Sequence, residues 1–243
     1  MHPITCIVLA GGKGTRAVSG GDRTPKIARP LRFEQTALAL AVSRALCIAA
    51  EVIVAVGPMR QYLSEFLIKS DRLTVTDDPG SGNAGALIES ARLARCSQTL
   101  VMNADTINDT SYSVFVDAHL KSRVGASILL SRSRSAQHAG AYHVGSEGQV
   151  LHSMEAKISA TFDSSLSSWR GASTGILIFP TRELRLIRVS DADTVEGAVT
   201  PLFIEMGRMQ AFNAGDIDTL DLGTPERISR ARELSDDAFL RRD

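Results

Sequence analysis

The feature that most constrains the fold is the first apolar run of the chain, residues 4–10 (ITCIVLA), which ends at two glycines. A strand with no polar face must be covered by helices on both sides, as in a parallel sheet. Residues 51–57 (EVIVAVG) and 99–103 (TLVMN) repeat the pattern, and helix-forming sequences lie between them. Alternating strands and helices favour a parallel sheet with right-handed crossovers, in which ligands bind beyond the carboxyl ends of the strands.

The second half of the chain predicts a hairpin and a capped final helix. Residues 141–144 and 149–153 flank a turn with glycines at both ends, Gly145 and Gly148. Thr224-Pro225-Glu226 has the residues preferred at an N-cap and in a first helical turn. We expect strands at 4–10, 51–57, 73–76, 99–103, 126–132, 141–144, 149–153 and 173–179, and helices at 35–50, 59–69, 84–96, 194–208 and 224–234. These patterns predict an α/β, Rossmann-like three-layer fold with a mostly parallel mixed sheet and a small β-hairpin region.

Composition excludes several classes of partner. Acidic and basic residues balance at 27 each, so no global field draws the chain to nucleic acid or to an anionic membrane. The three cysteines, Cys6, Cys47 and Cys96, lie far apart and form no CxxC pair, which favours a reducing, cytoplasmic location. The first apolar run is too short for a membrane span and has no basic segment before it.

The loop after the first strand has the chemistry of a phosphate site. Its sequence from Leu9 to Arg16 is LAGGKGTR, so small residues let backbone N–H groups approach a phosphate chain while Lys13 and Arg16 add positive charge. The spacing differs from that of a Walker A motif and from GxGxxG, which argues against a kinase and against a dehydrogenase. By itself, a strand followed by glycines and cationic residues indicates phosphate binding and does not identify the reaction.

This loop and five later segments resemble those of the sugar-1-phosphate nucleotidyltransferases, in the same order along nearly the whole chain. The segments are 11–16 (GGKGTR) with Pro25-Lys26, 77–86 (DDPGSGNAGA), 103–105 (NAD), Gly140 with 155–157 (EAK), 173–175 (STG) and 220–226 (LDLGTPE). In length and motifs the chain resembles the heptose-1-phosphate guanylyltransferases most. The resemblance implies a single nucleotidyltransferase domain over 1–243, with a nucleotide-binding half at about 1–110 and a sugar-phosphate-binding half at about 111–235.

The resemblance also implies a role for each matching residue. Arg16, Lys13 and Lys26 are expected to hold the phosphates and stabilise charge during transfer. The nucleoside triphosphate, with GTP expected, is assigned to Leu9, Ala10, Gly11, Gly12, Gly14, Thr15, Gly82, Asn83 and Asn103. The sugar 1-phosphate is assigned to Gly140, Glu155, Lys157, Ser173 and Thr174. In this reaction the attacking group is already an anion, so catalysis is mostly positioning and charge neutralisation.

Two aspartates have the chemistry of magnesium ligands. Asp105 follows a predicted buried strand and so belongs to the carboxyl edge of the sheet, and Asp221 ends another short apolar segment. A few hard oxygen ligands, completed by phosphates and water, describe Mg²⁺ sites. A homodimer is the candidate assembly.

Departures from the family pattern keep alternatives open: Asp77-Asp78 stand in place of a glutamate, and Gly20-Gly21 are additional residues in the phosphate loop. Ala104 replaces a glycine, Asn83 a threonine, and Ser173 an asparagine that holds sugar hydroxyls, so the acceptor is expected to be a different sugar or a cyclitol-like phosphate. The alternatives are a uridylyl- or thymidylyltransferase, a catalytically silent sugar-nucleotide sensor, and, more weakly, a molybdopterin-type cytidylyltransferase, whose Ser-x-Arg-Met continuation is missing here.

Overall fold

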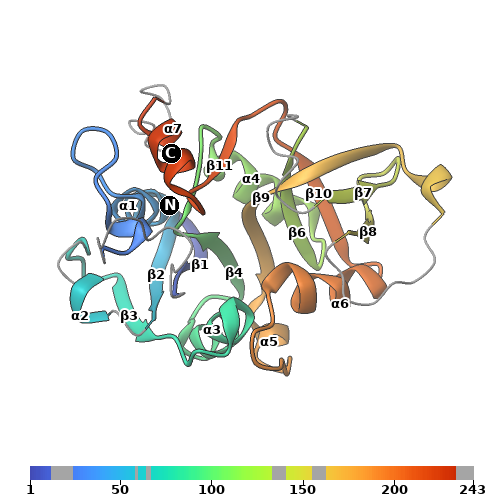
Figure 1. The fold of residues 1–243 in the computed structure, drawn as a ribbon. Helices are drawn as coiled ribbons and strands as arrows, with labels where there is room; N and C mark the ends of the chain where they lie inside the picture. The colour runs from blue at the N-terminus through green and yellow to red at the C-terminus, as the bar shows by residue number, and fades with distance from the viewer. Residues whose placement is uncertain (12–23, 58–59, 64–66, 133–140, 155–162, 234–243) are drawn as a thin grey trace.

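A computed structural model describes residues 1–11, 24–57, 60–63, 67–132, 141–154 and 163–233 (Figure 1). Its strands are β1 (His2–Ala10), β2 (Ala49–Val56), β3 (Leu73–Asp77), β4 (Gln98–Asn103), β5 (Thr106–Asn108), β6 (Ala126–Ser131), β7 (Ala141–Val144), β8 (Val150–Ser153), β9 (Trp169–Pro180), β10 (Met209–Asn213) and β11 (Thr219–Asp221). Its α-helices are α1 (Ala37–Ile48), α2 (Arg60–Leu63), α3 (Gly82–Leu93), α4 (Tyr112–Ser122), α5 (Thr181–Leu184), α6 (Thr200–Glu205) and α7 (Pro225–Ala231). Short 3₁₀ turns η2 (Lys26–Ala28) and η5 (Ser164–Leu166) and a π-helix η6 (Val195–Val199) complete the described elements.

The main sheet has the strand order β10-β6-β9-β4-β1-β2-β3. All neighbours on this path are parallel except β9, which runs antiparallel to both β4 and β6. The hairpin β7–β8 extends from β9, as the turn glycines predict. The predicted mostly parallel mixed sheet is therefore confirmed.

Strand β1 lies between β4 and β2, and its side chains alternate between two cores. Cys6 and Val8 face a cluster that includes α1 and α4 residues, whereas Ile7 and Leu9 face a cluster that includes α3 and α6 residues. Figure 1 shows α1 above the strands and α3 and α5 below them. This arrangement gives the three layers that the apolar run of β1 requires.

Some helix boundaries differ from those predicted. The helix expected at 84–96 begins two residues earlier, at Gly82, and the one expected at 194–208 is divided into η6 and α6. Helix α4 was not predicted, because Val114 faces solvent and His119 is buried, which obscures the apolar stripe. The final helix begins at Pro225 as predicted, and the Thr224 hydroxyl accepts a hydrogen bond from the Arg227 N–H.

A third cluster of apolar residues holds the end of the chain against the nucleotide-binding half. Leu220 and Leu222 flank Asp221, and they pack with Leu40 of α1, Ile107 of β5 and Ile228 of α7. Strand β11 pairs antiparallel with β5, with Asp221 opposite Thr106. This packing brings Asp221 next to the segment after β4, although the two are far apart in sequence.

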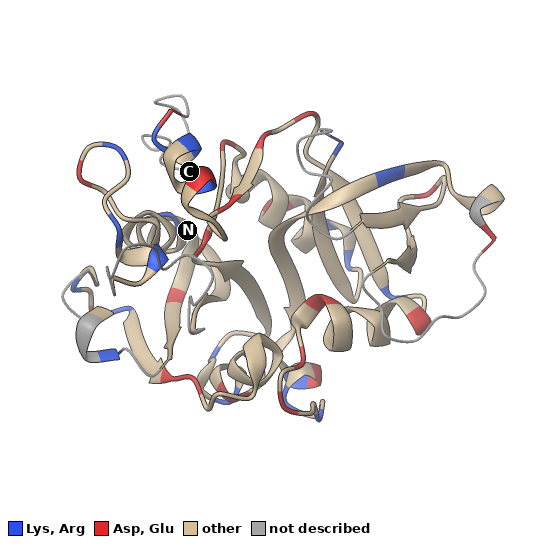
Figure 2. Cartoon of the chain, viewed as in Figure 1, with Lys and Arg blue, Asp and Glu red and all other residues tan. Residues whose placement is uncertain are grey.

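Charged residues of both signs are spread over the described fold (Figure 2). This distribution agrees with the formal net charge of zero. Among the described residues, no helix has both the length and the apolar character needed to span a membrane.

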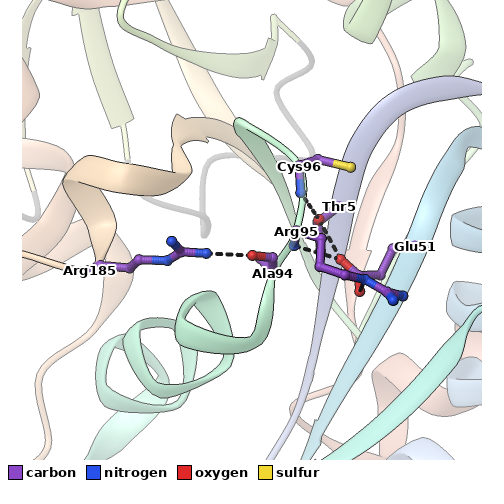
Figure 3. A network of polar contacts seen from close by, with 6 residues as sticks. All are labelled: Thr5, Glu51, Ala94, Arg95, Cys96 and Arg185. Atoms are coloured by element: carbon purple, nitrogen blue, oxygen red, sulfur yellow. Dashed lines mark hydrogen bonds and ion pairs between the residues drawn. The ribbon is translucent and has the colours of Figure 1, made fainter.

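A buried polar network joins β1, β2 and the end of α3 (Figure 3). Glu51, whose side chain is 8% exposed, accepts hydrogen bonds from the Thr5 hydroxyl at 2.8 Å, the Arg95 backbone N–H at 2.9 Å and the Arg95 Nε at 2.7 Å. The Thr5 hydroxyl in turn accepts from the Cys96 N–H. Arg185 donates to the carbonyls of Ala91 and Ala94, so orphan carbonyls at the end of α3 are satisfied.

The Glu51 network predicts a pH-dependent contribution to stability. Burial alone would raise the pKa of Glu51, but hydrogen bonds from Arg95 and Thr5 and the Arg95 charge hold that pKa below its ordinary value. A carboxylate with a lowered pKa stabilises the fold above its unfolded-state pKa, and this contribution is lost as the pH falls through the lowered value.

We therefore expect Glu51→Gln to lower the free energy of unfolding by about 1–3 kcal/mol at neutral pH, because the new amide donor faces N–H donors. The difference from the native chain should shrink in acid, which denaturant unfolding at several pH values measures. Glu89→Gln is the control, since Glu89 forms only a largely exposed pair with Arg92 and should change stability by less than about 1 kcal/mol. A Glu51→Gln penalty that does not vary with pH would contradict this account.

Candidate active site

The carboxyl end of β1 lies at the middle of the sheet, where a ligand is expected. Leu9 is in register with Ala55 of β2 and Asn103 of β4, and its carbonyl accepts a hydrogen bond from the Ala104 N–H at 3.0 Å. Ala10 and Gly11 follow at the sheet edge. The remaining predicted loop residues, Gly12, Lys13, Gly14, Thr15 and Arg16, lie outside the described residues.

Gly11 has no room for a side chain. A Cβ atom on this residue would overlap Asp78 Oδ2 and would lie 2.9 Å from Asp78 Cγ. The Asp78 carboxylate, which follows β3, therefore rests against the first glycine of the phosphate loop. Asp78 belongs to the segment 77–86, which resembles a family segment, but the sequence did not predict its contact with Gly11.

Lys26 and Asp105 form an ion pair beside this edge. Lys26 begins η2, whose next two residues, Ile27 and Ala28, are buried and anchor the turn. Its Nζ donates to Asp105 Oδ2, and the two side chains are 20% and 29% exposed. A cation and a carboxylate that were predicted to act at the phosphates are thus in contact with each other.

Asp221 reaches the same region through β11. Besides the pairing of Asp221 with Thr106, the Leu222 N–H donates to the Asp105 carbonyl at 2.8 Å. Buried Arg44 of α1 supports the end of β5, because it donates to the Asn108 carbonyl and the Tyr112 hydroxyl, both at 2.8 Å. Of the two predicted metal ligands, Asp221 therefore lies on β11, and Asp105 lies in the turn just before β5, the strand that pairs with β11.

The two aspartates fit a divalent cation whose other ligands come from substrate and water. Asp221 is 49% exposed and accepts a hydrogen bond from Arg227 at 3.0 Å, and Asp105 accepts one from Lys26, so each carboxylate faces one positive side chain. Within the described ranges, no three His, Cys, Asp or Glu side chains gather as a metal site. Carboxylate oxygens are hard ligands of the kind that bind divalent cations.

The side chain of Asn83 has a structural partner. Asn83 lies in the first turn of α3, where the N-cap is Ser81, and its Oδ1 accepts from the Val195 N–H at 2.9 Å. The Ala84 N–H donates to the Asp193 carbonyl at 3.2 Å. The helix starts before Asn83, and its first residues are tied to the segment before η6.

On the acceptor side, Ser173 and Thr174 lie in β9 beside Asn103. The Thr174 hydroxyl is buried and donates to the Leu129 carbonyl at 2.8 Å, whereas the Ser173 hydroxyl accepts from the Gly175 N–H at 3.1 Å. Gly175 has a φ of 75°, and a Cβ there would lie 3.2 Å from the Asn103 Nδ2. The structure brings Asn103 and residues 173–175 together; Gly140, Glu155 and Lys157 lie outside the described residues.

This fold and this edge are those of a nucleotidyl transferase. The sequence matches the nucleotidyl transferase family over residues 5–234, and the chain belongs to that family. The predicted resemblance and the expected transferase class are confirmed. No curated protein sequence matches the chain.

Solved structures share the fold at low sequence identity. HddC from Yersinia pseudotuberculosis is 20% identical with a TM-score of 0.72, and its complex with GMP-PN is 19% identical with a TM-score of 0.73; both matches cover 94% of this chain and 98% of HddC. A putative glucose-1-phosphate thymidylyltransferase from Bacillus anthracis, in complex with a sucrose, is 20% identical with a TM-score of 0.73 over 95% of this chain and 94% of that protein.

Gly82 offers a test of how the start of α3 is held. Its φ is 79°, and a Cβ would overlap the Asp193 carbonyl and lie 2.9 Å from Ala192 C. Gly207 has a similar φ of 65° but nothing within 4 Å, so Gly207→Ala incurs only the left-handed backbone penalty. We expect Gly82→Ala to destabilise the protein by about 1–3 kcal/mol more than Gly207→Ala, measured by denaturant unfolding. Equal losses of stability in the two variants would mean that the backbone at Asp193 moves away from the new Cβ atom at little cost.

Asp105→Asn tests the ion pair with Lys26. We expect nucleotidyl transfer to fall about 100-fold or more, since a charge that organises the phosphates is lost. Stability should change by less than about 1 kcal/mol, because the pair is partly exposed. Glu205→Gln, which neutralises an exposed carboxylate on α6, is the control. Steady-state kinetics and thermal unfolding on both variants separate the two effects; near-native activity in Asp105→Asn would remove Asp105 from the active site.

Proposed function

We propose that the enzyme transfers a nucleotidyl group from GTP to a sugar 1-phosphate, giving an NDP-sugar and pyrophosphate. The observation that carries this proposal is the juxtaposition of Lys26, Asp105 and Asp221 at the carboxyl end of the strands, beside the start of the phosphate loop. Family membership supports the reaction class. The whole chain acts as one domain in this proposal, since the main sheet runs through both halves.

The reaction needs no protein nucleophile. A phosphate oxygen of the acceptor attacks the α-phosphorus in line, one P–O bond forms, the bond between the α-phosphorus and the bridging oxygen breaks, and pyrophosphate leaves with the electron pair. Lys26 exchanges part of its contact with Asp105 for the reacting phosphates, and Lys13 and Arg16 hold the departing pyrophosphate. The contribution of these cations is electrostatic positioning of groups that carry opposite charge.

Mg²⁺ is the proposed metal, held by Asp105 and Asp221. When bound, it supplies positive charge that neutralises the phosphate oxygens. The carboxylates of this chain orient it, and the β5–β11 pairing sets their separation. Arg227 holds the Asp221 side chain, so this arginine acts through the carboxylate rather than on the substrate.

GTP is the proposed nucleotide, and the acceptor is heptose 1-phosphate or a related cyclitol phosphate. The GMP-PN complex of HddC supports a guanine nucleotide, whereas the Bacillus anthracis protein keeps thymidylyl or uridylyl transfer as the second candidate. On the acceptor side, the short Ser173 hydroxyl already accepts from Gly175, so it reaches less far than an asparagine would. A bulkier or differently hydroxylated acceptor than glucose fits this shorter side chain. A homodimer and a cytoplasmic location complete the proposal.

The test is pyrophosphate release with GTP, UTP and dTTP against a panel of sugar and cyclitol 1-phosphates. We expect kcat/KM for GTP to exceed that for UTP and dTTP by about 10-fold or more, since a polar base site rejects mismatched edges. Chelation with EDTA should abolish turnover and added Mg²⁺ should restore it. Turnover with UTP or dTTP and none with GTP would replace the guanylyl assignment by the second candidate; turnover that persists under chelation would rule out the metal.

A further inference from the structure

Arg132 places a cation at the carboxyl end of β6. Its backbone N–H donates to the Gly215 carbonyl at 2.9 Å, and the hydroxyl of the preceding Ser131 donates to the Ile217 carbonyl at 2.8 Å. The guanidinium lies over the Trp169 ring, with 4.9 Å between Cζ and the ring centroid. Because β6 runs in the same direction as β4 and β1, this cation lies at the edge of the sheet that carries the candidate active site.

The Trp169 ring that supports the cation is itself held in place. It packs against the buried cluster that contains Leu130 and Tyr142. It also covers Gly171, since a Cβ on this glycine would lie 2.7 Å from Trp169 Cζ3 and 2.8 Å from Leu130 Cβ. A guanidinium that stacks on an aromatic face keeps the N–H donors around the edge of its plane for other partners. Trp169 therefore orients Arg132 without occupying its donors.

Another stacked arginine of the chain has a different role. Arg44 lies over the Tyr112 ring, and its guanidinium donates to the Asn108 carbonyl and the Tyr112 hydroxyl, so these donors serve the fold. Arg132 is exposed, and no carboxylate or carbonyl within the described ranges accepts a hydrogen bond from its guanidinium. Its donors are therefore available to a ligand.

Strand register places Arg132 on the acceptor side of the site. Leu130 of β6 pairs with Ser173 of β9, and Arg132 follows Leu130 by two residues. Side chains two residues apart on a strand share a face, so Arg132 and Trp169 lie on the face that carries Leu130 and Ser173. The stacking of Arg132 on Trp169 agrees with this register. The cation thus lies beside β9, beyond the serine assigned to the acceptor.

An acceptor in the proposed orientation extends toward Arg132. Its phosphate lies at the ion pair of Asp105, two residues beyond Asn103, and Asn103 lies against Gly175 of β9. Its ring then lies between Asn103 and Ser173. The end of the acceptor remote from this phosphate points along β9, away from the ion pair and toward Arg132. A cation at that position suits an acidic group on the remote end.

We propose that Arg132, supported by Trp169, binds a second acidic group of the acceptor, a carboxylate or a second phosphate remote from the 1-phosphate. This inference rests on the proposed function, and it narrows the acceptor to a sugar or cyclitol 1-phosphate with two acidic groups. A guanidinium binds either group through two parallel charge-assisted hydrogen bonds, whereas a neutral hydroxymethyl group offers it one weaker acceptor. Arg132 is then a specificity-determining residue of the acceptor site.

Trp169 provides a direct measurement, because it is the only tryptophan of the chain and lies under Arg132. The native enzyme, with Mg²⁺ and a non-hydrolysable GTP analogue, should be titrated with mannose 1-phosphate, mannose 1,6-bisphosphate and mannuronic acid 1-phosphate, and with the matching glucose series. We expect a saturable change in tryptophan fluorescence and an affinity about 10-fold or more higher for an acidic member than for its neutral counterpart. The bisphosphate and the uronic acid distinguish a phosphate from a carboxylate.

Arg132→Gln removes the cation and should lower the ratio of acidic to neutral affinity about 10-fold, with a parallel fall in the ratio of kcat/KM values. Arg123→Gln is the matched control, since it removes an exposed cation just before β6, at the opposite end of the same strand. The control should keep the native ratios. Thermal unfolding should show that both variants remain folded.

The possible outcomes separate this inference from the proposed function. A native enzyme that binds the neutral members as well as the acidic ones, or an Arg132→Gln variant that keeps the native ratios, overturns the role of Arg132 and leaves nucleotidyl transfer to sugar 1-phosphates intact. Binding of acidic acceptors that Arg132→Gln weakens, with no transfer from any nucleotide, overturns the proposed reaction and retains the site. No binding and no transfer with any acceptor overturns both.

Discussion

The structure depends on the complete burial of β1. From Ile4 to Ala10 every side chain of this strand is buried, and alternate residues enter the two main cores. A strand of this kind is stable only when helices cover both faces of the sheet, so α1 and α4 on one side and α3 and α6 on the other follow from it. The carboxyl end of β1 is then flanked by β2 and β4, and Gly11 follows it at the edge of the sheet.

Around that edge, charge is organised by contacts between distant segments. Lys26 with Asp105 and Arg227 with Asp221 form two ion pairs near β5 and β11. The surroundings that set these positions are apolar: Leu220 and Leu222 on either side of Asp221 pack into the cluster with α1 and α7. Burial of these leucines aligns β11 with β5, and the alignment puts Asp221 beside the Asp105 segment. Hydrophobic packing therefore sets the position of Asp221 relative to the Asp105 segment.

The start of α3 and strand β9 show how residues near a site also serve the fold. Asn83 and the Ala84 N–H bind the segment before η6, and Thr174 binds Leu129 of β6. The Asn83 and Thr174 side chains therefore have hydrogen-bond partners inside the protein. Motif residues in these segments thus hold α3 and β9 in place within the fold.

Local sequence determined the β strands of the nucleotide half, the hairpin, the capped final helix and the family. Hydrophobic periodicity, turn glycines and helix-capping residues each act over only a few neighbouring residues. Asp105 was predictable at the sheet edge for the same reason, since it follows an apolar strand. Helix α4, the start of α3 and the division of η6 from α6 were not, because burial of His119 and contacts such as Gly82 with Asp193 override local preference. The pairings of Lys26 with Asp105, Asp221 with β5 and Asp78 with Gly11 were decided only by tertiary structure. Each joins residues on different strands or turns, and packing of the sheet and its flanking clusters, not sequence spacing, sets the distance between them.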